Sequence, residues 1–329
     1  MLPLRIGLIG LGHFGKHYAR LLQVIPGAEF VAVASTTKES IENSNVELDA
    51  RIIRAANAHE LLEDTSIDAV VIATPPSTHA DLICEALQAG KHVLVEKPMV
   101  LSLAEAKKVE KEVKSSGKIF MVGFQYVFNE YIRYIKEHIE SLGAIKYVVA
   151  ENLYPGPLRA DVGVFMDAGI HDFSIFEYLF SPGTVVDCTG ASRSFGNSTH
   201  DDFAAATVTF ANGLMAHMLT SWYWPEKVRK LTIVGDKGMV LFNDRDEIKL
   251  RWIEHKYPVW NKQKSSLFLP GLLEQKTTIP TVEAQEPLMN ELSYFIECVR
   301  THTEPVTGIE FGYKITTMMD HISEKLNRL

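Results

Sequence analysis

The residue best placed for chemistry in this sequence is Lys97, which stands between Glu96 and Pro98. Residues 93–96 form a short apolar run that ends on an acid, and such a run is typical of a buried strand. In an open α/β sheet the carboxyl ends of the strands face the crevice where ligands bind. Pro98 fixes φ and has no backbone N–H, so the chain leaves the sheet there and holds Lys97 at the rim. We expect Glu96 to pair locally and to position this loop.

A second pair of residues with chemical potential is Asp167 and His171, four positions apart. In a helix this spacing is one turn, so both side chains lie on one face. His171 has the ordinary pKa of a base that works near neutral pH. Asp167 would orient His171 or hold a hydroxyl group of a substrate. The alternative for such a pair is a helix cap or a surface contact.

The N-terminal residues carry the fingerprint of a dinucleotide-binding turn. An apolar strand over residues 4–9 runs into a Gly-x-Gly-x-x-Gly segment, and a helix pattern follows over residues 15–24. The first glycine allows the tight turn, the second lets the backbone approach a pyrophosphate, and the third lets the helix pack close to the strand. The free N–H groups of the helix N-terminus favour the phosphates. We expect this turn to bind the cofactor through Gly10, Gly12, His13, Phe14 and Gly15.

The second strand, over residues 30–34, bears on the choice between NAD and NADP. An acid at its end would grip the ribose 2′-hydroxyl of NAD. The sequence has Ser35, Thr36 and Lys38 there instead. A hydroxyl cluster with a lysine suits a 2′-phosphate better, so we favour NADP. NAD stays the alternative, with Lys38 beginning a solvated loop.

The next strand, over residues 68–73, ends in a proline-containing loop that begins with Thr74 and Pro75. The helix that follows carries His79 in its first turn, where it would touch the nicotinamide end of a cofactor or cap the helix surface. The cofactor-binding set therefore also includes Thr74, Pro75, His79, Glu96 and Lys97.

Together these residues predict hydride transfer between a nicotinamide and a secondary alcohol. The hydroxyl proton must leave at about the same time as the hydride, which calls for a base and for a positive group beside the forming alkoxide. Lys97 would stabilise the oxygen, or act as the base if burial lowers its pKa, and His171 is the other candidate base. No metal is needed, because Lys97 takes the electrophile's part.

The periodicity predicts an α/β protein of two domains. Residues 1–123 would form a Rossmann domain with a doubly wound parallel sheet, and residues 124–329 an α+β domain for substrate binding. The second domain has an open, mainly antiparallel sheet, because short turns join many of its strands as hairpins. We expect helices over residues 128–142, 169–180, 288–301 and 308–327, and strands over residues 145–153, 184–194, 203–210, 214–222, 231–234, 239–242 and 247–253. Residues 254–282 show no clear period and are interpreted as a long loop, as a lid or a dimer arm.

Polar and aromatic residues of the second half are candidates for the substrate side: Gln125, Tyr126, Tyr154 and Arg159. Arg159 would bind a carboxylate or phosphate of the substrate, or would be solvated. The Trp222-Tyr223-Trp224 segment is interpreted as packing or interface in preference to a sugar-stacking surface.

The composition limits the classes of partner. The 329 residues are 46% hydrophobic and 22% charged, with a net charge of −8. No block of Lys and Arg stands out, which argues against nucleic acid. The cysteines, Cys84, Cys188 and Cys298, form no metal-ligand spacing and no disulfide framework. No apolar run is long enough for a membrane span, and a strand begins at once at the N-terminus, so we expect a cytoplasmic protein.

In four motifs the sequence resembles the Gfo/Idh/MocA family, the glucose–fructose oxidoreductase and inositol dehydrogenase group. The motifs are Gly10-x-Gly12-x-x-Gly15, the Thr74-Pro75…His79 loop, Glu96-Lys97-Pro98, and Asp167-Ala168-Gly169-Ile170-His171. The resemblance implies an NAD(P)-dependent oxidoreductase acting on a sugar, nucleotide-sugar or cyclitol. It also implies a cis peptide bond before Pro98, and a homodimer or homotetramer formed through the open sheet.

Two positions depart from the pattern of the family. Its common Asp three residues after the histidine is Ser174 here, with Asp172 directly after His171, and Val127 replaces an Arg. Two other interpretations stay open: a dihydrodiol dehydrogenase-like or tetrapyrrole reductase-like enzyme on the same fold, and a cofactor-binding sensor without turnover. The presence of Lys97, Asp167 and His171 argues against the sensor.

Overall fold

The computed structural model describes residues 2–44, 46–156, 158–196, 199–256 and 273–326. The chain divides into two compact units, Met1–Phe128 with Gln285–Asp320, and Asn129–Ala284 with His321–Leu329. The sequence predicted one boundary, after residue 123, which placed residues 285–320 in the second domain. In the structure these residues pack within the first unit. Phe311, for example, lies against Phe124, with 5.4 Å between the ring centroids.

The first unit contains a parallel six-stranded sheet in the order β3-β2-β1-β4-β5-β6. Its strands are β1 (Leu4–Ile9), β2 (Ala28–Ala34), β3 (Ile53–Ala55), β4 (Ala69–Ile72), β5 (His92–Glu96) and β6 (Phe120–Gly123). All four residues of β4 are buried, as in a central strand whose two faces are both covered. This order is that of a doubly wound Rossmann sheet, so the predicted fold of the first domain is confirmed.

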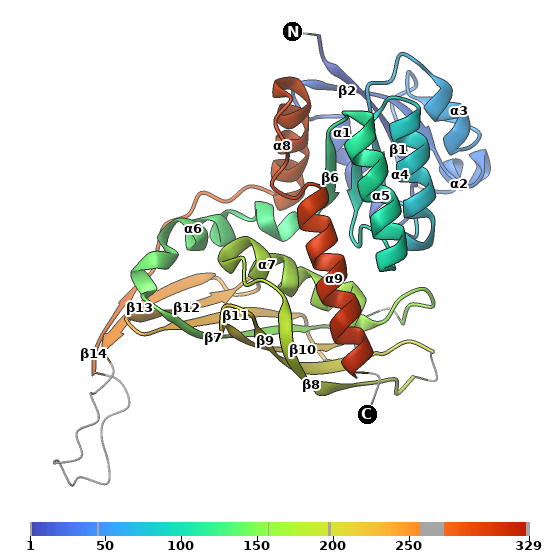
Figure 1. Ribbon diagram of the computed structural model, residues 1–329. Helices are drawn as coiled ribbons and strands as arrows, with labels where there is room; N and C mark the ends of the chain where they lie inside the picture. Colours follow the sequence, from blue (N-terminus) through green and yellow to red (C-terminus); the bar gives the residue numbers. More distant parts are fainter. Residues whose placement is uncertain (1, 45, 157, 197–198, 257–272, 327–329) are drawn as a thin grey trace, which may run out of the picture. The chain divides into compact units, whose positions relative to one another are not determined.

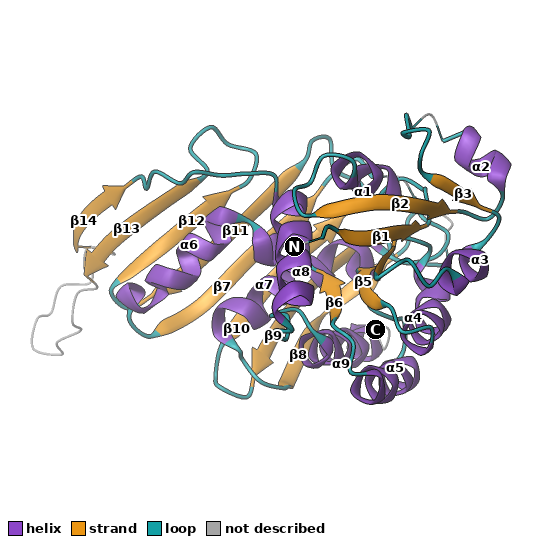
Figure 2. Ribbon diagram, turned by 90° about the horizontal axis from the view of Figure 1, so that it is seen from above, coloured by secondary structure: helices purple, strands orange, loops and turns teal. Residues whose placement is uncertain are grey.

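Helices cover both faces of this sheet, with α4 and α5 on one face and α1 on the other (Figure 2). The helical elements of this unit are α1 (Gly15–Leu22), α2 (Lys38–Glu42), α3 (Ala58–Glu63), η1 (Pro76–Thr78), α4 (His79–Gln88), α5 (Leu103–Ser116), η2 (Gln125–Phe128), α8 (Pro287–Thr301) and the first part of α9 (Ile309–Leu326). Ser102 caps the N-terminus of α5, because its side chain accepts a hydrogen bond from the backbone N–H of Glu105.

The second unit contains an eight-stranded sheet in the order β14-β13-β12-β11-β7-β10-β9-β8. The strands are β7 (Ile145–Leu153), β8 (Val185–Arg193), β9 (Phe203–Phe210), β10 (Met215–Ser221), β11 (Val228–Gly235), β12 (Gly238–Asn243), β13 (Leu250–Lys256) and β14 (Leu273–Thr278). Strands β7 and β10 pair in parallel, and the other described pairs are antiparallel. The prediction of a mainly antiparallel second sheet is therefore confirmed.

Helical segments of this unit pack on one face of the sheet (Figure 1). They are α6 (Glu130–His138), η3 (Ile139–Leu142), the π-helical turn η4 (Phe165–Gly169) and α7 (Ile170–Phe180). Every second residue of β9 and β12 is buried, which is the alternation of a sheet with one packed face.

The interpretation of residues 254–282 as a loop is wrong for residues 254–256 and 273–278. Residues 254–256 complete β13, and Leu273–Thr278 forms the edge strand β14, which pairs with β13. The suggested lid or dimer arm concerns mainly residues 257–272, which lie outside the described residues. In the part of the chain that the structure describes, no helix has the length and apolar character to cross a membrane.

Candidate active site

The glycine turn after β1 has the geometry that a dinucleotide requires. Gly10 adopts φ +99°, and a Cβ there would lie 2.5 Å from the carbonyl oxygen of Ala73. A Cβ on Gly15 would collide with the carbonyl oxygen of Gly10, so only glycine at this position lets α1 begin so close to the turn. A Cβ on Gly12 would meet no atom within 4 Å. The open space beside Gly12 and the N-terminus of α1 therefore fit a pyrophosphate.

The hydroxyl groups after β2 are arranged as a small cluster. Thr37 begins α2 by accepting a hydrogen bond from the backbone N–H of Ser40. The Ser40 hydroxyl lies 2.8 Å from that of Ser35, and Thr36 is exposed beside them. The side chain of Lys38 is outside the described residues, so its predicted role stays a prediction.

His79 lies inside the first unit and not on a helix surface. It is 0% exposed; its Nδ1 lies 2.9 Å from the carbonyl oxygen of Pro98, and its Nε2 lies 3.0 Å from that of Thr74. Burial is the main cause that lowers the pKa of His79. The suggested surface cap is therefore wrong, and the ring instead braces the Thr74 loop against the Lys97-Pro98 loop.

The Glu96-Lys97-Pro98 turn contains the cis peptide bond that the family resemblance implied. Glu96 ends β5 and is 6% exposed, and its Oε2 accepts the backbone N–H of Lys97 at 3.0 Å. Lys97 is half-buried at the carboxyl edge of the sheet. The local pairing expected of Glu96 is thus present, and it fixes the backbone from which the Lys97 side chain extends.

Two residues behind this turn were missed from the sequence. The hydroxyl oxygen of Tyr18 lies 2.8 Å from Glu96 Oε1 and 2.8 Å from Oε1 of Glu291 on α8. The signal available was a glutamate inside the apolar stripe of a helix, between Leu288 and Phe295, at a position that should be buried.

Of the proposed substrate residues in the first unit, Gln125 is half-buried and Tyr126 is almost buried, both in η2. Val127, at the position where the family has an Arg, is also buried there.

In the second unit Asp167 lies in the π-helical turn η4, an irregularity often found at functional sites. Its Oδ2 accepts a hydrogen bond from the hydroxyl of Tyr154, with 2.8 Å between the oxygens. Its Oδ1 accepts a hydrogen bond from Nη1–H of Arg159, with 2.9 Å between nitrogen and oxygen. Nε1–H of Trp222 donates to the Tyr154 oxygen at 2.8 Å. Tyr154, Arg159 and Asp167, all predicted from the sequence, therefore form one network around a single carboxylate. Burial is the main cause that raises the pKa of Tyr154, and the negative charge of Asp167 is the second.

Arg159 is not simply solvated, which was one of its two suggested states. Its guanidinium also donates to both carboxylate oxygens of Asp161, at 2.9 and 2.6 Å. These hydrogen bonds lower the pKa of Asp161 and raise the pKa of Arg159. The arginine therefore joins two acids, and it orients Asp167 whether or not it also meets a substrate anion.

The π-helical turn is held from beneath by two residues that the sequence did not suggest. Nδ2–H of Asn152 on β7 donates to the carbonyl oxygen of Ala168 at 3.0 Å. Nη2–H of Arg229 on β11 in turn donates to the Asn152 Oδ1 at 3.0 Å. Asn152 is 1% exposed, so this support is fixed inside the second unit.

His171 is the second residue of α7, one turn after Asp167, and is 6% exposed. The hydroxyl of Ser174, at the position where the family commonly has an Asp, donates a hydrogen bond to the carbonyl oxygen of His171 at 2.7 Å. Its hydrogen bond is therefore made within the backbone of α7. Burial raises the pKa of the neighbouring Asp172 well above its ordinary value.

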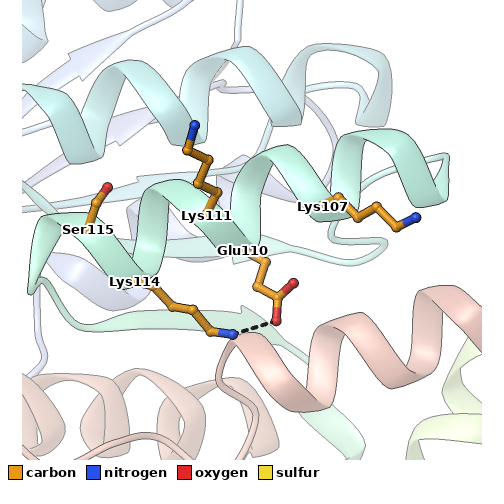
Figure 3. A pocket seen from close by; sticks show the side chains of 5 residues that line it. All are labelled: Lys107, Glu110, Lys111, Lys114 and Ser115. Atoms are coloured by element: carbon orange, nitrogen blue, oxygen red, sulfur yellow. Dashed lines mark hydrogen bonds and ion pairs between the residues drawn. The ribbon is translucent and has the colours of Figure 1, made fainter.

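Trp222, with 3% exposure, packs with Val164, Ala168 and Tyr154, whereas Tyr223 and Trp224 are exposed, so the packing interpretation holds for Trp222 alone. A shallow hollow elsewhere, on the outer face of α5, has a different character (Figure 3). It is lined by Lys107, Glu110, Lys111, Lys114 and Ser115. It contains none of the predicted site residues and is a solvated charged face.

Comparison with known proteins gives the family. Residues 4–124 match the model of the oxidoreductase family with an NAD-binding Rossmann fold, and residues 132–241 match the GFO/IDH/MocA C-terminal domain. UDP-N-acetylglucosamine 3-dehydrogenase of Acidithiobacillus ferrooxidans is 31% identical over 92% of this chain and 90% of its own. The chain belongs to the GFO/IDH/MocA oxidoreductase family.

A second relative and a solved structure are similar over almost the whole chain. The NAD(+)-dependent scyllo-inositol 2-dehydrogenase of Bacillus subtilis (strain 168) is 29% identical over 92% of this chain and 88% of its own. A solved structure of the Acidithiobacillus ferrooxidans dehydrogenase superposes with a TM-score of 0.85, covering 100% of this chain and 99% of that one. At 24% identity in that superposition, the structure shows the shared fold.

Proposed function

We propose that the protein transfers a hydride between a nicotinamide dinucleotide and a secondary alcohol or ketone of a cyclitol, sugar or nucleotide-sugar. The observation that carries this proposal is the Asp167 carboxylate, oriented by Tyr154 and Arg159, on a chain whose glycine turn fits a dinucleotide. An oriented carboxylate one turn before a histidine suits a substrate with neighbouring hydroxyl groups. The inositol and nucleotide-sugar dehydrogenases among its relatives support this substrate class.

The roles follow from the chemistry of each group. The cofactor, when bound, supplies the hydride acceptor or donor. The backbone beside Gly12 and the N-terminus of α1 hold the pyrophosphate. Lys97 stabilises the negative charge on the reacting oxygen, and His171 accepts or returns the hydroxyl proton. Asp167 fixes His171 or a neighbouring hydroxyl of the substrate.

We propose NADP as the preferred cofactor. The hydroxyl groups of Ser35 and Thr36 offer donors to a 2′-phosphate, and no acid stands at the end of β2 to bind a ribose 2′-hydroxyl. Ser35→Asp introduces a negative charge there and should shift the ratio of affinities toward NAD by about tenfold or more. An unchanged ratio in fluorescence titrations with NADPH and NADH would contradict the preference.

We further propose that the exposed face of the second sheet forms a homodimer or homotetramer. Tyr147 and Met215, paired across β7 and β10, are 40% and 43% exposed, and Val186 on β8 is 56% exposed. Apolar side chains on an open sheet face are typical of a protein interface. Light scattering should give a mass of two or four chains, and a monomer at micromolar concentration would contradict it.

The free cysteines support a reducing compartment, and we propose the cytoplasm. Cys84 and Cys298 are buried thiols and Cys188 is half-buried, and none is in a disulfide. Fractionation of the source cells should recover the protein with the cytoplasmic enzymes, and recovery outside the cell would contradict this.

Variants of Lys97 test the proposed chemistry. Lys97→Ala should lower kcat by at least about a hundredfold while the cofactor still binds, because the glycine turn is untouched. Lys107→Ala, on the exposed face of α5, is the matched control and should leave turnover unchanged. Wild-type turnover by the Lys97 variant would remove this residue from the mechanism.

A further inference from the structure

A buried cluster of two carboxyl groups and one phenol lies directly behind the Lys97 turn. Tyr18 of α1 and Glu291 of α8 are 0% exposed, and Glu96 at the end of β5 is 6% exposed. The Tyr18 oxygen lies 2.8 Å from an oxygen of each carboxyl group. All three residues belong to the first unit, although Glu291 is far from the other two in sequence.

Counting hydrogens shows that this cluster needs an additional proton. A phenol has one O–H and can donate to only one of two acceptors. Two ionised carboxylates would therefore leave one 2.8 Å contact without a hydrogen, between a negative oxygen and the phenol lone pairs. Both contacts are hydrogen bonds only if one carboxyl group is protonated and donates to Tyr18.

The surroundings decide which carboxyl group carries the proton. Glu96 already accepts the backbone N–H of Lys97 through Oε2, which favours its ionised form. Oε2 of Glu291 is buried and has no hydrogen-bond partner among the described residues, a costly state for an ionised oxygen. Burial first, and then the charge of Glu96, raise the pKa of Glu291 well above its ordinary value. The proton therefore belongs on Glu291.

Among the described residues, Glu291 itself faces one other charged group, Glu96. The titratable groups that face Glu291 are Tyr18 and Glu96, and β6 presents Gly123 to it. A Cβ on Gly123 would lie 3.0 Å from the Tyr18 oxygen and 3.2 Å from Oε1 of Glu291. The glycine thus leaves room for the three polar groups to meet.

We propose that Glu291 is a protonated acid in the folded protein and a positioning residue for Lys97. The protonated Glu291 donates a hydrogen bond to Tyr18, and Tyr18 donates one to Glu96. Glu96 remains the carboxylate that accepts the backbone N–H of Lys97. The positioning role rests on the proposed function of Lys97, whereas the protonated state does not.

Infrared difference spectroscopy tests the protonated state without any turnover. The spectrum of the wild type minus that of Glu291→Gln at pH 7 should contain the carbonyl band of one protonated carboxylic acid. Glu297→Gln, an exposed position on the same helix, is the matched control and should give only a carboxylate difference. Absence of the acid band from the Glu291 difference spectrum would overturn the proposal. If Glu291→Gln does not fold, Tyr18→Phe replaces it, and the acid band should then shift.

Kinetics test the positioning role. Glu291→Leu removes the donor to Tyr18 and should lower kcat by about tenfold or more with little change in the cofactor Kd, because Tyr18 then no longer holds in place the Glu96 carboxylate that anchors the Lys97 backbone. Glu291→Gln keeps a donor and should recover most of this loss, with activity that extends to higher pH than in the wild type. Equal losses in the Gln and Leu variants would overturn the positioning role.

The two proposals fail in distinguishable ways. If no substrate is turned over but the infrared band is present, the proposed function fails and the protonated Glu291 stands. If Lys97→Ala abolishes turnover but the band is missing, only the inference about Glu291 fails.

Discussion

The glycine turn gives the sharpest prediction, because two neighbouring glycines should respond differently to the same change. A methyl group on Gly12 would meet no atom within 4 Å, so Gly12→Ala should change the free energy of unfolding by less than about 0.5 kcal/mol. A methyl group on Gly15 would collide with the backbone carbonyl of Gly10. Gly10 itself has a φ of +99°, which only glycine adopts readily, so its backbone cannot easily move away. Gly15→Ala should therefore cost about 1–3 kcal/mol, as overpacking does.

The effect on cofactor binding should not follow the effect on stability. If a pyrophosphate occupies the open space beside Gly12, the added methyl group displaces it, and Gly12→Ala should weaken binding by about 10- to 100-fold, or 1.4–2.7 kcal/mol. Gly15→Ala should weaken it as well, through the displaced helix. Thermal unfolding without cofactor and fluorescence titration with NADPH measure the two quantities separately. Wild-type affinity in Gly12→Ala would refute the placement of the cofactor at this turn.

Two further predictions concern the second unit and the response to acid. Tyr154→Phe keeps the ring but removes the hydroxyl shared by the N–H of Trp222 and one oxygen of Asp167, which should cost about 1–3 kcal/mol and lower kcat/KM by about tenfold. Tyr134→Phe, on α6 and outside this network, is the control. Equal effects of the two changes would contradict the network. Burial first, and then the charges of Lys118 and His302, lower the pKa of His92 to about 4, while its Nδ1 accepts the N–H of Ile119. Because the folded state disfavours the charged imidazole, stability should be complete above about pH 6.5 and should fall as the pH drops toward 4. His92→Gln should make this loss shallower in urea unfolding, and an unchanged acid limb would contradict the assignment.

The sequence predicted most of the first unit because its signals are local. A strand, a glycine turn and a helix in succession define a Rossmann unit without knowledge of distant residues, and Gly10 has the positive φ that this pattern requires. The apolar runs of the central strands likewise predicted a sheet covered on both faces.

The features that were missed depend on distant partners or on hydrogen-bond shifts. Strand β14 has a polar sequence and is a strand because β13 offers it an edge. The π-helical turn at Asp167 differs from an α-helix by a shift of one hydrogen bond, which leaves no trace in periodicity. Glu291 meets Tyr18 only after α8 packs in the first unit, and local spacing cannot predict that contact.

The proposed site itself was predicted in part. The network of Asp167, Tyr154 and Arg159 unites residues that the sequence had assigned separately, whereas the joint action of Lys97, Asp167 and His171 stays a prediction. His79 is a buried brace and not the surface cap that was one of its two predicted roles, because two carbonyl groups from separate loops converge on its ring. Its contact with a nicotinamide stays a prediction.

The most direct measurement is the absorbance of reduced nicotinamide when the protein receives NADP or NAD with a panel of inositols, sugars and UDP-sugars. We expect the absorbance to rise with at least one of these polyols, and the rise to disappear in Lys97→Ala. No rise with any member of the panel, while fluorescence shows that the cofactor binds, would contradict the proposed hydride transfer to or from this class of substrate.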